Sequence, residues 1–326
     1  MTNITRRAAL GAAAGLALSA GGAAAQAWPS RAVRIVVPLV PGGTTDAIAR
    51  VIADPLSRLI GQPVVVENRA GANGWIANEY VARQPADGHT LIVNNVSTHG
   101  INSAFAAGRP VNPSRDLAPV TNLVEVPQLI VVPGTSPART LAEFVELARR
   151  APRPLVYASA GVGSYQHMDM EVLAARAGIQ LVHLPLRGAG EMVPAVLRDD
   201  AQIGEFNLVA ALPHVREGRL RALAAVGRER LPQLPEVPTT VESGFPEITT
   251  TLWNGLFAPA ATPEPIVAAL HRHVTAILRD PEIVAGQARI GVRVTPSESP
   301  AAFAEYVARD VARWSAIVRE FNITLS

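Results

Sequence analysis

The stretch that decides the fold reads Val33-Arg34-Ile35-Val36-Val37-Pro38-Leu39-Val40-Pro41-Gly42-Gly43-Thr44-Thr45-Asp46. Its first five residues are rich in apolar β-formers, which predicts a buried strand of a largely parallel sheet. The two prolines end the strand because proline has no N–H to donate to a neighbour. The glycine pair permits a tight turn, and the polar residues after it are typical of a helix N-terminus. A strand that leads through a glycine-rich loop to the positive end of a helix forms a candidate anion site.

The loop does not match the nucleotide-binding patterns. A Walker loop ends in Gly-Lys-Ser or Gly-Lys-Thr, and this chain contains no lysine. A dinucleotide fingerprint needs three spaced glycines, whereas Gly42 and Gly43 are adjacent. The alternative is that these glycines serve only the packing of a strand against a helix, which is common in α/β domains. The loop alone leaves both interpretations open.

Strand and helix patterns alternate along most of the chain, which predicts α/β architecture. Strands at 64–66 and 91–95 follow the opening helix, and extended runs at 128–133 and 249–258 have the character of crossings between two bodies. We therefore expect two doubly wound α/β lobes joined by a two-strand hinge. The first lobe comprises residues 28–127 plus 252–326, and the second comprises residues 128–251.

Two segments near the opening stretch carry more detailed expectations. The first helix is expected over 46–59, with Gly61 as its end. Pro55 lies inside this helix and predicts a kink or a division in two. Residues 96–100 are expected to form a hydroxyl-rich loop after the third strand, at the same edge of the sheet as the first loop.

Several short motifs follow one another along the chain. They are the opening Ile35-Val36-Val37-Pro38 with Pro41-Gly42-Gly43-Thr44-Thr45-Asp46, then Gly61-Gln62-Pro63-Val64-Val65-Val66-Glu67-Asn68-Arg69, Pro85-Ala86-Asp87-Gly88-His89-Thr90-Leu91, Ala158-Ser159-Ala160-Gly161-Val162-Gly163-Ser164, Leu220-Arg221-Ala222-Leu223-Ala224, Pro235-Glu236-Val237-Pro238-Thr239, Trp253-Asn254-Gly255-Leu256 and Ala258-Pro259-Ala260-Ala261-Thr262-Pro263. Their order and spacing resemble the Bug (TctC-like) family, the extracytoplasmic solute receptors of tripartite tricarboxylate transporters. The resemblance implies a type II binding-protein architecture and capture of a small organic acid. It also implies the membrane permease subunits of such a transporter as partners.

Residues 1–27 have the features of an export signal. Arg6 and Arg7 precede an alanine-rich apolar stretch that is too short to span a bilayer, and Ala25-Gln26-Ala27 forms a cleavage site before Trp28. The twin arginine favours the Tat route, and an ordinary Sec signal is the alternative. We therefore expect a periplasmic protein. No later stretch is long and apolar enough for a membrane helix.

The composition excludes several classes of function. Cysteine and lysine are both absent, which removes thiolate metal sites, a thiol nucleophile, a lipoprotein anchor and Schiff-base chemistry. Without the signal, Lys+Arg falls from 29 to 27 and equals the 27 Asp+Glu. No basic run or nucleic-acid module is present. We expect a monomer without cofactor, metal or nucleic-acid partner.

The candidate ligand-binding residues follow strands in both lobes. They are Gly43, Thr44, Asp46, Ser97 and Thr98 in the first lobe, and Ser159, Gly163, Ser164, Arg187 and Asn207 in the second. Backbone N–H groups and hydroxyls from opposite lobes are suited to hold a carboxylate between them. Since an aspartate cannot hold an anion, Asp46 is expected to fix its loop or to meet a ligand ammonium group.

The family resemblance supports the first loop and the serine-rich loop of the second lobe. Two positions depart from the family's pattern, which often has Tyr-Lys-Gly at 186–188 and an aspartate at 207. For Arg187 and Asn207, a surface arginine and a strand-end asparagine are therefore the alternatives. The ligand class stays open at these two positions.

The rival function is an exported hydrolase that acts on a small ester or amide. A serine elbow reads Gly-x-Ser-x-Gly after a strand, and Ala158-Ser159-Ala160-Gly161 lacks the first glycine. No spaced set of serine, aspartate and histidine stands out in the chain, although such residues can be brought together from any order. We expect a binding protein with no catalytic residues.

Overall fold

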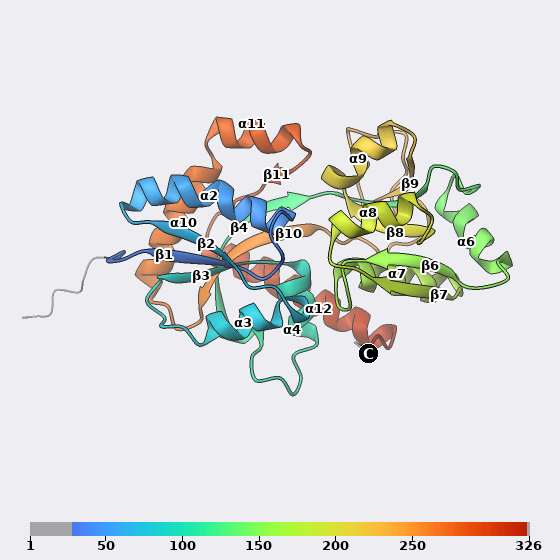
Figure 1. The fold of residues 1–326 in the computed structure, drawn as a ribbon. Coiled ribbons are helices and arrows are strands. Elements are labelled where there is room, and N and C mark those ends of the chain that lie inside the picture. The colour runs from blue at the N-terminus through green and yellow to red at the C-terminus, as the bar shows by residue number, and fades with distance from the viewer. Residues whose placement is uncertain (1–27, 325–326) are drawn as a thin grey trace, which may run out of the picture.

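The computed structural model describes residues 28–324 and contains two β-sheets that lie end to end (Figure 1). The signal predicted at 1–27 lies outside the described residues. The first sheet has the strand order β11 (Arg293–Val294), β4 (Leu117–Val126), β10 (Leu252–Pro259), β3 (Thr90–Asn95), β1 (Val33–Val37) and β2 (Val64–Asn68). The second has the order β7 (Leu181–Pro185), β6 (Leu155–Ser159), β8 (Ile203–Asn207), β5 (Gln128–Pro133) and β9 (Leu220–Val226).

Both sheets are mixed, which corrects the expectation of a largely parallel sheet around β1. β1 runs parallel to β2 and β3, but β10 is antiparallel to both β3 and β4. In the second sheet β6 is parallel to β7 and β8, and β5 is antiparallel to β8 and β9. The sheets are mixed because the strands by which the chain enters and leaves the second sheet run antiparallel to their neighbours. The ends of β1 and β3 still lie at the same edge.

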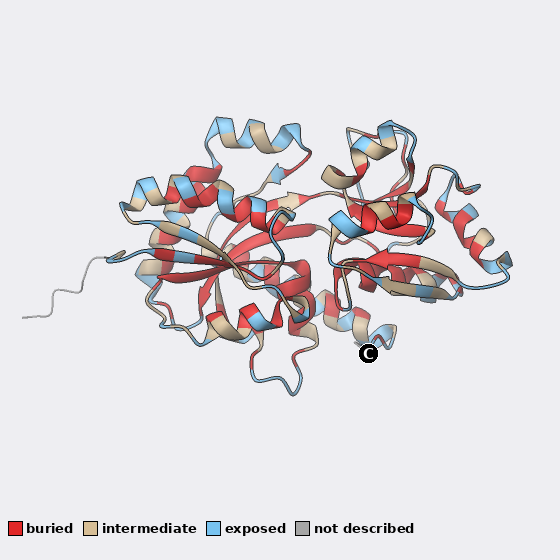
Figure 2. Ribbon diagram, viewed as in Figure 1, coloured by how far each residue is buried: buried red, intermediate tan, exposed pale blue. Residues whose placement is uncertain are grey.

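Helices cover both faces of each sheet (Figure 1). The helical segments are α2 (Thr44–Ile60), η1 (Ala72–Gly74), α3 (Trp75–Ala82), η2 (Val96–Ile101), α4 (Asn102–Ala104), α5 (Pro113–Asp116), α6 (Leu141–Arg150), α7 (Tyr165–Ala177), α8 (Ala189–Leu197), α9 (Leu208–Arg216), α10 (Glu264–Leu278), α11 (Pro281–Arg289) and α12 (Pro300–Glu320). On β5 the side chains alternate, so that Leu129 and Val131 pack with α8 and α9, and Ile130 and Val132 pack with α6 and α7. Figure 2 shows the resulting buried layers within each sheet.

The chain passes between the two sheets twice, from β4 to β5 and from β9 to β10. After the second crossing, α10 packs on α2 and α12 packs on β4 and η2. The second sheet and its helices are thus inserted into the chain of the first. Within residues 28–324 no helix has the length and hydropathy needed to cross a bilayer.

Two local expectations differ from the structure. Pro55 does not divide α2 in two, since the helix continues from Thr44 to a left-handed C-cap at Gly61. Proline has no N–H, so one carbonyl of the helix lacks its hydrogen-bond partner. The helix tolerates this loss because it packs along the first sheet through a continuous apolar face. The segment after β3 is a helical turn, η2, and not a loop. Asn95 caps it by accepting the N–H groups of Ser97 and Thr98, and this cap outweighs the low helix propensity of the segment.

Candidate functional site

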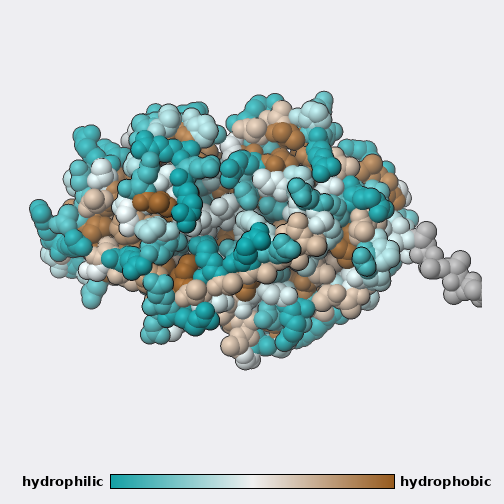
Figure 3. All heavy atoms as spheres, turned by 180° about the vertical axis from the view of Figure 1, so that it is seen from behind, coloured by the Kyte–Doolittle hydropathy of each residue, from teal (hydrophilic) through white to brown (hydrophobic). Residues whose placement is uncertain are grey.

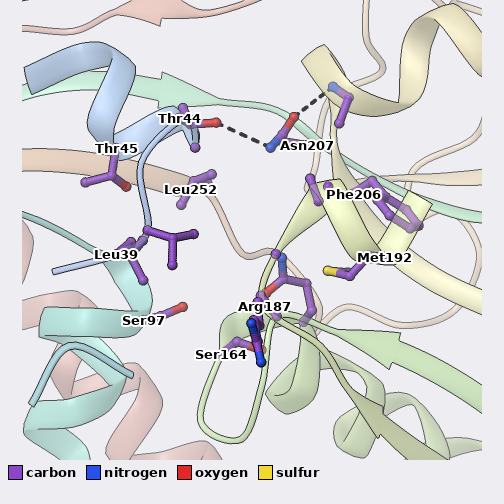
Figure 4. A pocket seen from close by; sticks show the side chains of 18 of the residues that line it. Leu39, Thr44, Thr45, Ser97, Ser164, Arg187, Met192, Phe206, Asn207 and Leu252 are labelled. Carbon is purple, nitrogen blue, oxygen red and sulfur yellow. Dashed lines mark hydrogen bonds between the residues drawn. The ribbon is translucent and has the colours of Figure 1, made fainter. Parts of the chain in front are cut away.

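A cavity of about 580 Å³ lies between the two lobes at the edge where β1, β3, β6 and β8 end. Its lining comes from three segments of the first lobe, four of the second and the start of β10. The lining residues are Leu39–Thr45, Asn73, Asn95, Ser97, Ala160, Ser164–Gln166, Arg187–Met192, Glu205–Asn207, Val209, Ala210 and Leu252. Figure 4 shows side chains of this lining, with Thr44 of the first lobe facing Asn207 of the second.

The N-terminus of α2 is the first polar wall of the cavity. Its N-cap is Gly43, which has an extended backbone and offers no side-chain acceptor to the first turn. Because the first N–H groups of a helix have no partner within the helix, those of the α2 start remain for a ligand. Asp46 stabilises the turn before α2 by accepting the N–H of Gly42 at 3.0 Å.

The N-terminus of α8 forms a second wall, in the other lobe. Its N-cap is Gly188, at φ 137° and again without a side-chain cap. A residue with a Cβ is strained at this φ, so glycine permits the close approach of the backbone. The neighbouring Arg187 side chain is 84% exposed, and its Nε lies 3.9 Å from Glu191. Two uncapped helix N-termini therefore face the cavity from opposite lobes, with a cation beside one of them.

Three hydrogen bonds join the lobes around the cavity. The backbone N–H of Tyr165 donates to Ser97 Oγ at 3.0 Å, and Asn73 Nδ2 donates to the carbonyl of Gly163 at 2.8 Å. Asn207 Nδ2 lies 3.4 Å from Thr44 Oγ1 (Figure 4). These contacts position hydroxyl and amide groups of both lobes at one place.

Comparison with known proteins agrees with this arrangement. A family model described as "Tripartite tricarboxylate transporter family receptor" matches residues 48–323. The chain belongs to this family. Protein BugT of Bordetella pertussis is 33% identical over 310 residues, which are 92% of this chain and 92% of BugT. A protein from the tcbD–tcbE intergenic region of Pseudomonas sp. strain P51 is 35% identical over 327 residues, 99% of this chain and 96% of that one.

Solved structures of similar proteins share the fold. MatC from Rhodopseudomonas palustris with bound malate is 34% identical, with a TM-score of 0.82 over 89% of this chain and 100% of MatC. Rpa4515 of the same organism with adipate is 33% identical, with a TM-score of 0.83 over 91% of this chain and 99% of that one. The predicted family and the predicted fold of two α/β lobes are confirmed.

Six of the predicted site residues line the cavity of this receptor. Their groups come from the starts of α2, α7 and α9, from η2 and from the loop before α8. These residues are Gly43, Thr44, Ser97, Ser164, Arg187 and Asn207. Ser164 and Asn207 also cap helices, because their side chains accept the N–H groups of His167 and Ala210.

The other four predicted residues are not among the lining residues. Asp46 is buried and receives hydrogen bonds from Arg50, Asn68 and the N–H of Gly42. Thr98 Oγ1 accepts the N–H of Asn95. Ser159 is the last residue of β6, and Gly163 lies in the turn before α7, where its carbonyl accepts the interlobe hydrogen bond from Asn73. These residues shape the site without forming its surface.

Ser159 at the end of β6 and His183 of β7 do form a pair, but neither residue lines the cavity. Ser159 Oγ lies 2.6 Å from His183 Nε2, and the same oxygen accepts the N–H of Gly161. Ser159 is fully buried. Burial, then the neighbouring His167, lower the pKa of His183 to about 4. The pair fixes the turn that leads into α7, and nothing in its position favours the hydrolase.

Several lining residues were not predicted from the sequence. The polar ones include Asn73, Asn95, Gln166 and Glu205, and the apolar ones include Leu39, Met192, Phe206 and Leu252. Asn95 ends β3 and could have been found by the rule that selected Asn207. Glu205 is an acid inside an otherwise apolar strand, which is itself a signal. Among residues 28–324 no group of three or more His, Asp or Glu side chains is arranged to hold a metal ion.

Proposed function

We propose that this receptor captures a small organic carboxylate in the cavity between its lobes and delivers it to the membrane permease subunits of a tripartite tricarboxylate transporter. The observation that carries the proposal is the pair of uncapped helix N-termini, α2 and α8, which face the cavity from opposite lobes. Helix N-termini bind anions through free N–H groups and the helix dipole. The relatives solved with malate and adipate support a carboxylate as the ligand.

The magnitudes are sufficient for tight binding. A hydrogen bond to a charged group contributes about 1.5–3 kcal/mol net. A helix N-terminus adds up to about 2 kcal/mol in a partly buried site. Micromolar affinity corresponds to about 8 kcal/mol. A few N–H and hydroxyl donors from the two lobes therefore suffice, with Arg187 available for a second acidic group.

The lining of the cavity favours a hydrocarbon body in the ligand. Leu39, Met192, Phe206 and Leu252 give the cavity an apolar part of its lining (Figure 4). An acid with an aliphatic or aromatic chain buries apolar surface there, at about 25 cal/mol per Å². A ligand with hydroxyls along its whole length leaves them facing carbon and loses their hydration.

The cellular setting belongs to the same proposal. Residues 1–27 carry an export signal of the Tat type, and the mature receptor works in the periplasm as a monomer. The first lobe comprises 28–127 plus 252–326 and the second 128–251, and ligand binding closes them by favouring the state in which both lobes contact it. The rear face of the molecule supports the monomer, because its apolar residues are scattered among hydrophilic ones (Figure 3).

A thermal-shift screen tests the proposed function. The protein starts at Trp28 and is unfolded and refolded to remove bound ligand. The panel holds mono-, di- and tricarboxylates, aromatic acids, amino acids and neutral sugars. A ligand at about 100 times its dissociation constant adds about 2.7 kcal/mol of stability, a shift of several degrees for a chain of this size. Shifts confined to carboxylates support the proposal, and shifts by sugars alone contradict it.

A further inference from the structure

Two buried carboxyl groups lie beneath the cavity and lack ordinary partners. Glu205 of β8 lines the cavity, and Asp169 lies on α7, about one turn of helix after the lining residue Tyr165; both residues are 0% exposed. Neither oxygen of Glu205, nor Oδ2 of Asp169, receives an N–H or O–H from another described side chain or backbone group. The two carboxyls lie within hydrogen-bonding reach of each other.

A directional chain of hydrogen bonds continues from this pair to the first lobe. Thr250 Oγ1 donates to Asp169 Oδ1 at 2.9 Å and accepts from Arg313 Nη2 at 3.2 Å. Arg313 belongs to α12, and its Nε lies 3.7 Å from Asp310 on the same helix. Trp253 Nε1 donates to Asp310 Oδ2 at 3.0 Å. The pair is thus connected through the return crossing to a helix of the first lobe.

The positive charge near Glu205 and Asp169 can neutralise only part of the negative charge that the two carboxylates would carry if both were ionised. Arg313 is the cation that acts on Asp169 and Glu205, and it is shared with Asp310, which opposes ionisation of Asp169. Tyr165 of α7 is a buried neutral phenol whose O–H donates a hydrogen bond to Gln128 Oε1 of β5. Two ionised carboxyls in contact repel each other, and burial removes the water that would screen them. One proton between them supplies the missing hydrogen bond and removes the repulsion.

We propose that Glu205 and Asp169 share one proton, and that this proton makes Glu205 a specificity-determining residue, because the cavity accepts an anion only while the pair retains it. The effect of the proton on anion binding rests on the proposed function. The shared proton itself does not, because it is inferred from the two buried carboxyls alone.

The direction of the pH dependence follows from the pair. Burial raises the pKa of Asp169 to about 6, against the lowering effects of Arg313, Thr250 and Glu205. Burial, and then the neighbouring Asp169, raise the pKa of Glu205 well above its usual range. An anion in the cavity favours the protonated pair further. Above the pKa of the pair in the free receptor, binding therefore takes up one proton, and affinity falls up to about tenfold for each pH unit.

Carbon-13 NMR of the ligand-stripped receptor, labelled at the carboxyl carbons of Asp and Glu, tests the shared proton. In a titration from about pH 4 to about pH 9, one carboxyl pair is expected to stay protonated above the usual range for these residues. Glu205→Gln and Asp169→Asn each remove this titration. Glu171→Gln, a matched change on α7 whose partner is Tyr157, leaves it unchanged. Ordinary titration of every carboxyl in the unmodified receptor overturns the proposal.

Binding of adipate and of malate, each used as a defined probe, tests the link to the anion. The dissociation constant of the unmodified receptor is expected to rise as the pH passes through the titration of the pair seen by NMR, with uptake of one proton by calorimetry in two buffers. Glu205→Gln flattens this profile and Glu171→Gln retains it. Equal affinity below and above that titration overturns the link. If neither acid binds at any pH, the proposed ligand class fails, while the NMR titration still decides whether the pair holds a proton.

Discussion

At the scale of single residues, Asp46 shows how a carboxylate supports an anion site without touching the anion. It holds Gly42 at the turn before α2 and is itself held by Arg50 and Asn68. Burial opposes its ionisation, but these hydrogen bonds outweigh burial and lower the pKa of Asp46. The hydrogen bonds of the Asp46 carboxylate thus go to its neighbours. The N–H groups at the start of α2 remain available to a ligand in the cavity.

Asp46→Asn is expected to lower the free energy of unfolding by about 1–2 kcal/mol at neutral pH, because hydrogen bonds to a charged group become ordinary ones. A lowered pKa in the folded state means that the charge stabilises the fold above about pH 4 and that this stabilisation is lost as the pH falls further. Urea unfolding at several pH values measures the difference. A gap between variant and parent that stays constant down to about pH 2 contradicts the role given to the charge.

Ser164→Ala is expected to weaken carboxylate binding, because Ser164 lines the cavity and caps α7. Loss of the cap costs about 1 kcal/mol of stability, a few degrees in melting temperature. Ser299→Ala is a matched control, since Ser299 caps α12 in the same way and does not line the cavity. Equal affinities for the two variants in a titration would place the site elsewhere.

Thr44→Val removes a hydroxyl of the α2 start but keeps the backbone N–H and the shape of the side chain. We expect affinity to fall about twofold to tenfold, the value of one ordinary hydrogen bond. The melting temperature of the free protein should stay within a few degrees, because the contact of Thr44 with Asn207 is long, at 3.4 Å. Unchanged affinity in calorimetry, here and for Ser164→Ala, would exclude this wall of the cavity.

The residues that the sequence could predict were those at strand ends. Asn207 ends a strand, and Thr44, Ser97 and Ser164 lie at the start of the helical segment that follows a strand, so their positions are set by local pattern. Phe206 and Leu252 line the same cavity but look like any other core residue, because their exposure depends on how two lobes meet. That relation is formed by contacts far apart in the sequence, and no local pattern encodes it.

At the scale of elements, most strands and helices could be predicted, and the exceptions have physical causes. The end of α2 at Gly61 follows from a left-handed C-cap, at φ 67°, which glycine adopts without strain. The order of strands was beyond prediction, since β10 enters between β3 and β4 from more than a hundred residues away. η2 was missed because its stability comes from the reciprocal cap between Asn95 and Thr98.

Gly74→Ala tests the packing of the loop before α3 against η2. Gly74 has φ +86°, and a Cβ there would lie 2.8 Å from Thr98 Cγ2. Gly61→Ala is the matched control, with φ +67° and no heavy atom within 4 Å of the added Cβ. The control should cost about 1–2 kcal/mol through its backbone alone, and Gly74→Ala about 1–3 kcal/mol more through the clash. Equal losses in denaturant unfolding would refute the tight contact.

At the scale of the whole molecule, the two lobes hold each other through contacts outside the ligand. Asn73→Gly removes the amide that reaches Gly163 and suits the positive φ of 49° at this position. We expect a several-fold faster ligand dissociation with little change in association, because the bond forms only when the lobes meet. Asn322→Gly, also at φ 49°, controls for backbone flexibility. Stopped-flow measurements in which the two variants release ligand at the same rate contradict this role.

The insertion of the second sheet into the chain of the first has a consequence for biosynthesis. Every strand of the second sheet is translated between residues 128 and 226, as one uninterrupted segment. The first sheet lacks its middle strand until Pro259 has left the ribosome, since β10 joins β3 to β4. A nascent chain that stops just after β9 contains every strand of the second sheet, while β3 and β4 still have unpaired edges. The first lobe, whose synthesis begins first, is therefore the last to complete its sheet.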